Sequence, residues 1–150
     1  MEVFVKRIDE TLDLPKYESE GAVGFDLVCR DSTQINPNSI ALLPSNLVVK
    51  VPKEYMLMLA PRSSLFKKKG LIMPNSVGII DQDYCGDNDE LLLQVYNITN
   101  NIVNIKRGEK LGQGIFVKIK KVKFKESKLK FGENRGGFGS TDKWSLYREI

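Results

Sequence analysis

The residues with the clearest chemical potential lie in one stretch, residues 78–86, which reads GIIDQDYCG. An apolar run ends there in Asp81, and apolar neighbours can partly desolvate a carboxylate and leave it a competent general base at neutral pH. Asp83 falls on the same face of an extended chain, and Tyr84 adds a flat ring beside the acids. The stretch predicts a base next to an aromatic wall. Taken alone, it also fits a turn capped by the Asp-x-Asp pair, which by itself only suggests metal binding.

Arg62-Ser63-Ser64 follows a β-like run and a proline, and it opens the one helix-like piece, residues 63–69. A guanidinium, two hydroxyls and exposed amide groups are concentrated there, which is typical of an anion site. In the alternative, a serine caps the helical turn and Arg62 pairs with a carboxylate. Asp26 is the obvious carboxylate, because it interrupts an apolar strand in which an acid is rarely buried without a partner.

A glycine-rich segment, GGFGST at residues 136–141, combines glycines for close backbone approach with hydroxyls for phosphate. The ring of Phe138 could stack on a base, so the segment predicts a lid that closes over a nucleotide. A disordered tail is the alternative. A P-loop is disfavoured, because the segment lacks G-K-[ST] and no helix follows it. Residues 107–110 fit a charged turn, and Gln113 in the next strand could point an amide at a ligand.

Length and composition limit the chemistry further. The chain has 150 residues, which fits one domain and is too short for two independent enzymatic cores. It has no histidine, which excludes Ser-His-Asp and Cys-His catalysis and imidazole-bound metals. Its two cysteines, Cys29 and Cys85, cannot form a disulfide framework and match no zinc knuckle, so a reducing compartment is favoured.

Charge and apolar content indicate the partners. The net charge of +4 is not gathered in an arginine-rich arm, so polyanions are plausible ligands and nucleic acid is not implied. The first eight residues do not resemble a secretory signal, and no apolar run approaches the roughly 20 residues that span a bilayer. We expect no nucleic-acid or membrane partner, and a cytoplasmic protein, or a nuclear one if the source is eukaryotic or viral.

The elements that must position these residues are short strands between turn signals, which is typical of an all-β sandwich or barrel. The expected strands are residues 3–8, 24–29, 40–51, 55–60, 77–80, 91–99, 102–105 and 111–124. Lysines alternate with apolar residues over 118–124, which predicts a strand with one buried and one solvated face. Four glycines between 132 and 139 predict a flexible C-terminal arm, so we divide the chain into a domain over 1–129 and an arm over 130–150.

Five blocks together resemble the five motifs of the homotrimeric dUTPase family. In order they are AVGFDL (22–27), PRSSL (61–65), GIIDQDYCG (78–86), RGEKLGQ (107–113) and GGFGST (136–141). The resemblance implies a jelly-roll-like β-barrel or sandwich with one short helix. It also implies a homotrimer, in which each active site is shared between subunits and closed by the C-terminal arm of a neighbour.

The implied reaction is hydrolysis of dUTP to dUMP and diphosphate, which keeps uracil out of DNA and supplies dUMP for dTMP synthesis. Asp81 would orient and deprotonate a water for in-line attack at the α-phosphorus. Tyr84 would press on the deoxyribose and leave no room for a 2′-hydroxyl. Mg²⁺ would be the cofactor, held mainly by triphosphate oxygens and water without a direct protein ligand.

The resemblance also assigns binding roles. Residues 71–80 would form a β-hairpin that receives uracil, through Asn75 and the backbone of Gly78, Ile79 and Ile80. The phosphates would be bound by Arg62, Ser63, Ser64 and Gln113, with Asp26 as the support of Arg62. From the arm, Phe138 would stack on uracil, and Gly139, Ser140 and Thr141 would close on the γ-phosphate. Arg135 stands two positions later than the family's arginine, a departure from the motif.

Two other functions remain open at this point. A dCTP deaminase shares the Arg-Ser-Ser block, but its catalytic glutamate aligns with Gln94, which cannot serve as a base. A non-catalytic, dUTPase-like regulator would bind the nucleotide and signal to a protein partner. Diphosphate release from dUTP would separate the enzyme from the regulator.

Overall fold

The computed structural model describes residues 1–137, in which strands account for nearly all regular structure. The strands are β1 (Val5–Arg7), β2 (Phe25–Val28), β3 (Thr33–Ile35), β4 (Ile40–Pro44), β5 (Leu47–Val49), β6 (Tyr55–Pro61), β7 (Leu71–Ile72), β8 (Gly78–Ile80), β9 (Leu92–Asn97), β10 (Val103–Ile105) and β11 (Lys110–Lys118). One helix, α1 (Leu65–Lys69), accompanies them in this part of the chain. The predicted all-β class is confirmed.

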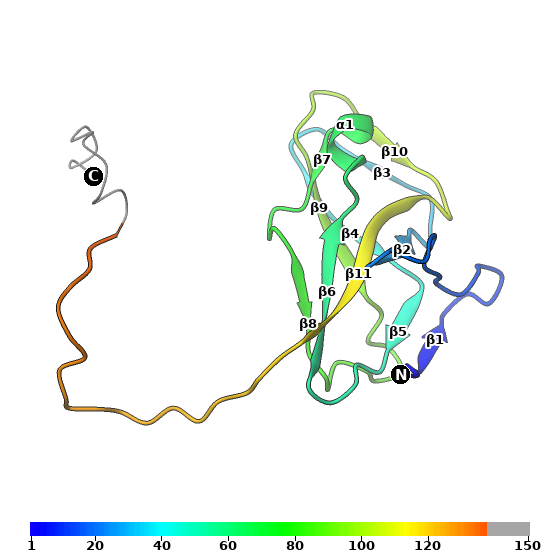
Figure 1. The fold of residues 1–150 in the computed structure, drawn as a ribbon. Helices are drawn as coiled ribbons and strands as arrows, with labels where there is room; N and C mark the ends of the chain where they lie inside the picture. Colours follow the sequence, from blue (N-terminus) through cyan, green and yellow to red (C-terminus); the bar gives the residue numbers. More distant parts are fainter. Residues whose placement is uncertain (138–150) are drawn as a thin grey trace.

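Two antiparallel sheets form a jelly-roll-like sandwich (Figure 1). The larger sheet has the strand order β2-β11-β6-β8, and the smaller has the order β4-β9-β7. Strands β1 and β5 form a separate pair, as do β3 and β10. No barrel closes among residues 1–137, so the sandwich is the one of the two expected architectures that is found.

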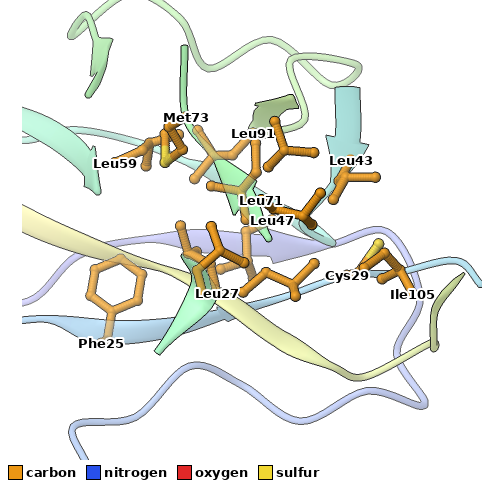
Figure 2. Packing of buried hydrophobic residues seen from close by; sticks show 14 of the residues in the cluster. Phe25, Leu27, Cys29, Leu43, Leu47, Leu59, Leu71, Met73, Leu91 and Ile105 are labelled. Carbon is orange, nitrogen blue, oxygen red and sulfur yellow. The ribbon is translucent and has the colours of Figure 1, made fainter. Parts of the chain in front are cut away.

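The core follows from the alternation of side chains, because successive residues of a strand point to opposite faces. Leu57 and Leu59 are the buried residues of β6, and Leu93 and Val95 are buried in β9. Figure 2 shows side chains from both sheets meeting in one cluster, with Phe25 at one end. Interiors of this kind are close-packed, so truncating one fully buried leucine to alanine costs about 2–5 kcal/mol.

The predicted helical turn is present as α1, which begins after Ser64. The Ser64 side chain makes no capping hydrogen bond, so the capping alternative is not found for this serine. Gly70 ends the helix in the left-handed conformation, with φ 63°, and its N–H donates to Phe66 O. No helix among the described residues is long and apolar enough to cross a membrane.

β11 ends at Lys118, so the predicted continuation of this strand to residue 124 is wrong. Lys118 pairs with Tyr55, the first residue of β6, and only the Ile119 N–H reaches further, to Glu54 O at 2.8 Å. Beyond that point β6 offers no partner. Residues 120–137 are exposed, without regular structure, and leave the body of the molecule (Figure 1). The expected buried face is also absent, because Phe124 is 97% exposed. The division into a domain over residues 1–129 and an arm over residues 130–150 stays a prediction.

Candidate active site

Three polar side chains meet at one end of β6. Asp26 of β2 lies opposite Gln113 of β11, and Gln113 lies opposite Ala60 of β6. Arg62 follows the end of β6, and its Nε lies 3.0 Å from Asp26 Oδ1. This is the ion pair that the burial of Asp26 led us to expect, and it orients the guanidinium. Gln113 Nε2 donates to Pro61 O at 3.2 Å, which ties the amide to the same corner.

A cavity of about 280 Å³ opens beside Arg62, and cations dominate its wall. The wall consists of Arg62, Ser64, Leu65, Lys68, Lys69, Glu109, Lys110 and Leu111. Glu109, its single carboxylate, lies 2.7 Å from Lys69 Nζ. Burial raises the pKa of Glu109, but hydrogen bonds from Lys69 and from the Lys106 backbone outweigh it and lower this pKa overall. Ser63, on the adjoining turn, is exposed. The excess positive charge suits the cavity to a polyphosphate chain.

The predicted base and its neighbours lie at the other end of β6. Gln82 Nε2 donates to Tyr55 O at 2.9 Å, which fixes their loop to the start of this strand. The chain turns immediately after Asp81, because the Tyr84 N–H donates to Asp81 O at 3.4 Å. The extended conformation predicted for 81–83 is therefore wrong, and the turn alternative describes the backbone.

Asp81 is exposed in the single chain, so the partial burial expected from its apolar neighbours is not supplied here. The reason is local: Ile80 packs against the core, whereas Ile79 points outward and is 53% exposed. Asp81 lines a hollow of about 650 Å³, whose wall also contains Asp83 and Lys53. A carboxylate at the edge of such a hollow is accessible to water and to a ligand.

The Tyr84 ring is anchored through its hydroxyl. Its hydroxyl donates to Glu90 O at 3.2 Å. The Glu90 carboxylate in turn accepts two hydrogen bonds from Arg30, at 3.0 and 3.2 Å, and one from the Asn46 N–H at 2.7 Å. The hydrogen bond to Glu90 O fixes the hydroxyl end of the ring, and Tyr84 remains 38% exposed, so the ring offers a fixed flat surface.

Residues 71–80 do not form the predicted paired hairpin. β7 pairs with β9, whereas β8 pairs with β6, so the two strands belong to different sheets and the loop between them spans the sandwich. Asn75 is exposed on this loop, and Ser76 takes a positive φ of 62°. The loop turns on two backbone hydrogen bonds, from the Ser76 N–H to Met73 O at 3.0 Å and from the Val77 N–H to Asn75 O at 2.7 Å.

A single chain does not bring the cationic corner around Arg62 together with the loop around Asp81. Ile80 pairs with Leu57, whereas Arg62 lies five residues further along β6 and its continuation. At about 3.3 Å per residue this separates them by roughly 17 Å, and Asp81 lies one residue further still. The described chain therefore presents two half-sites, which we call the phosphate half (Asp26, Arg62, Ser63, Ser64, Gln113) and the base half (residues 71–84).

Arg135 is exposed on the segment that leaves the body, away from regular structure. Phe138, Gly139, Ser140 and Thr141 lie outside the described residues. Within residues 1–137, no group of three or more acidic, cysteine or histidine side chains could hold a metal ion.

Sequence reasoning missed Lys110, which it treated as part of a charged turn. Its Nζ lies 2.9 Å from Asp26 Oδ2. A register shift between Lys110 and Gly112 in the pairing of β11 with β2 brings it to this position, and no local pattern marks that shift. The excess of cations over acids in residues 106–110 was the only signal available.

The comparisons with known proteins agree with one another. A family model described as dUTPase matches residues 10–142. The deoxyuridine 5′-triphosphate nucleotidohydrolase of Hydrogenobaculum sp. is 37% identical over 144 residues, covering 94% of this chain and 98% of the relative. The protein of the same name from Fusobacterium nucleatum is 37% identical over 139 residues, covering 90% and 93%. The crystal structure of dUTPase from Streptococcus mutans superposes with a TM-score of 0.74 at 35% identity, covering 80% of this chain and 98% of that one.

Proposed function

The chain belongs to the dUTPase family, and from this membership we propose that it hydrolyses dUTP to dUMP and diphosphate. The observation that carries the proposal is the pair of half-sites at the two ends of β6. One is a cationic corner suited to a triphosphate, and the other offers an acid, an aromatic ring and an open loop suited to a nucleoside. Neither half alone could bind and cleave the nucleotide.

In the base half, Asp81 acts as the general base that orients and deprotonates the attacking water at the α-phosphorus. Its exposure beside a hollow supports this role, because the water must reach it. Tyr84 packs on the deoxyribose and rejects a 2′-hydroxyl by overlap. The polar edge of uracil is read by Asn75, Gly78, Ile79 and Ile80, and a close fit there rejects cytosine and thymine.

In the phosphate half, Arg62, Ser63, Ser64 and Gln113 bind the triphosphate, and Asp26 supports Arg62. The 3.0 Å contact between Arg62 and Asp26 supports this assignment, because it aims the guanidinium. Mg²⁺, when bound, neutralises charge on the phosphates. It would be held mainly by triphosphate oxygens and water, since the described acidic side chains do not cluster into a cage.

We further propose that a complete site takes its base half from one copy and its phosphate half from another, within a homotrimer. The roughly 17 Å between the halves supports this, because the triphosphate of one nucleotide is much shorter. The C-terminal arm of a neighbouring copy would close the site. Its proposed contacts are those of Gly139, Ser140 and Thr141 with the γ-phosphate, together with Arg135, and that of Phe138 with the uracil.

Removal of dUTP would keep uracil out of DNA, and the dUMP formed would feed dTMP synthesis. Action in the cytoplasm, without a nucleic-acid or membrane partner, stays a prediction. A non-catalytic nucleotide-binding regulator remains the alternative function. The dCTP deaminase alternative is weaker, because Gln94 of β9 offers an amide where that reaction needs a carboxylate.

The test measures diphosphate and ammonia released from dUTP, UTP, dCTP and dTTP with Mg²⁺ present. We expect diphosphate from dUTP alone and no ammonia. Asp81→Asn should slow the reaction by about a thousandfold and leave dUTP binding intact, in line with the loss of a general base. Asp87→Asn, in the same loop with an 89% exposed side chain, is the matched control. Tight dUTP binding without diphosphate release would favour the regulator instead.

A further inference from the structure

We propose that Lys110 is a positioning residue for dUTP hydrolysis: it holds the second oxygen of Asp26 and so keeps Arg62 aimed at the triphosphate. The inference rests on the proposed function. It concerns a residue outside the set that sequence reasoning assigned to the site.

The Asp26 carboxylate is held at both oxygens by different cations. Oδ1 lies 3.0 Å from Arg62 Nε, and Oδ2 lies 2.9 Å from Lys110 Nζ. The Asp26 side chain is only 14% exposed, and Oδ2 has no well-aligned hydrogen-bond donor among residues 1–137. The positive charge of Lys110 therefore offsets the negative charge on this buried oxygen. Without Lys110, Oδ2 would be buried with no partner.

Lys110 is itself fixed. Its Nζ lies 2.5 Å from Glu18 Oε1, on the N-terminal loop. The hydrogen bond that Lys110 donates to Glu18, and then the close contact with Asp26, hold the pKa of Lys110 above its usual value, so the ammonium keeps its charge. The backbone contributes as well, because the register shift in β11 pairs Lys110 with Val28. Val28 lies two residues from Asp26 and shares its face of β2, so the ammonium reaches the carboxylate.

The result is a row of alternating charges, Glu18, Lys110, Asp26 and Arg62, that ends at the phosphate half. A carboxylate held at both oxygens cannot turn about its last side-chain bond, whereas one held at a single oxygen can. If Asp26 turned, the guanidinium of Arg62 would lose its fixed direction. Displacing a binding group by about 1 Å can cost up to a hundredfold in rate.

Lys110 also forms part of the wall of the cationic cavity, so direct contact with the triphosphate is the competing role. The two roles differ in their dependence on Asp26. A positioning residue loses its effect when the residue through which it acts is removed, whereas a direct ligand keeps it. A double-mutant cycle between Lys110 and Asp26 measures this difference.

The experiment determines kcat and KM for dUTP hydrolysis in the full-length protein with Mg²⁺. Lys110→Ala should lower kcat/KM by about tenfold to a hundredfold, and Lys110→Arg should restore it to within about threefold of the parent. In an Asp26→Asn background, Lys110→Ala should add less than about a threefold loss. Arg107→Gln is the control, because it frees the same N-terminal loop by breaking the 2.6 Å contact with Asp9 but leaves Asp26 untouched. It should stay within about twofold of the parent.

A full loss from Lys110→Ala in the Asp26→Asn background would overturn the inference and make Lys110 a direct ligand. So would a Lys110→Ala variant with the activity of the parent. Should this variant fail to fold, Glu18→Gln replaces it, with an expected loss of about threefold that disappears in the Asp26→Asn background. Absence of that loss in the parent background overturns the inference. A parent protein that does not hydrolyse dUTP rejects the proposed function itself.

Discussion

Two inactive variants of this protein should restore activity when they assemble together. Asp81→Asn removes the base half, and Arg62→Ala weakens the phosphate half. If each site combines halves from different copies, a site that takes Asp81 from the second variant and Arg62 from the first is intact. Within one chain these groups lie at opposite ends of β6, so neither variant can repair its own site.

The size of the recovery follows from symmetry. In a cyclic assembly, each site combines the base half of one subunit with the phosphate half of the next. A cyclic trimer that contains both variants has a single site with both intact halves, whichever variant is in excess, so about one third of parental activity should return in mixed trimers. Sites built within single chains would return none.

Co-expression of the two variants with different affinity tags, followed by purification on both tags, supplies the mixed assemblies. Diphosphate release from saturating dUTP gives the number of working sites. A matched experiment combines the parent with the Asp81→Asn/Arg62→Ala double variant. When the two chains are produced equally, shared sites in the mixed trimers then retain about one sixth of parental activity per chain, whereas sites within single chains retain about one half.

Mixed assemblies that carry both tags but show only the activity of the separate variants would refute the shared site. A recovery of one half in the matched experiment would refute it independently. Either result would mean that one chain forms a complete site by itself, despite the roughly 17 Å that the strand register places between its two halves.

Four further outcomes are expected. Tyr84→Phe removes the hydroxyl that anchors the ring and should raise the ratio of UTP to dUTP turnover about threefold; an unchanged ratio would contradict the anchoring role. Gly114→Ala would place a Cβ 2.4 Å from Phe25 Cζ, so urea unfolding should show a loss of about 1–3 kcal/mol, against no loss if the ring moves aside freely. Deleting the C-terminal arm (130–150) should abolish dUTP turnover and shift the unfolding temperature by less than about 3 °C, because the described part of the arm is exposed; retained turnover would argue against closure by the arm. A hydrogen bond from Thr11, above all, lowers the pKa of Asp9, so the ionised Asp9 stabilises the fold above its ordinary pKa near 4, and this contribution is lost as the pH falls. Asp9→Asn should therefore flatten the decline in unfolding temperature below about pH 4, and an unchanged decline would contradict this.

The sequence predicted which side chains need a partner, and the fold class, better than it predicted where the strands place each residue. The pairing of Asp26 with Arg62 could be expected because a carboxylate within an apolar strand needs a partner. The all-β class followed from short runs with β-like spacing. Neither inference depends on strand register, which is why both could be made from local patterns.

Features that depend on register could not be predicted in this way. Strand β11 stops at Lys118 because its neighbour begins at Tyr55, a fact of pairing that the alternating lysines do not encode. The same holds for β7 and β8, which looked like one hairpin and belong to different sheets. The position of Lys110 depends on the register shift in the pairing of β11 with β2. The exposure of Asp81 follows from which of its apolar neighbours packs inward.

The separation of the half-sites along β6 has a consequence for how activity depends on protein abundance. On the proposed shared site, a newly made chain is inert until it meets other copies, and turnover per chain falls when dilution drives the copies apart. A defective copy does not merely remove its own contribution, because it also spoils a site that its neighbour helps to build. The length of one strand would thus make the reaction sensitive to expression level, and make damaged subunits harmful to intact ones.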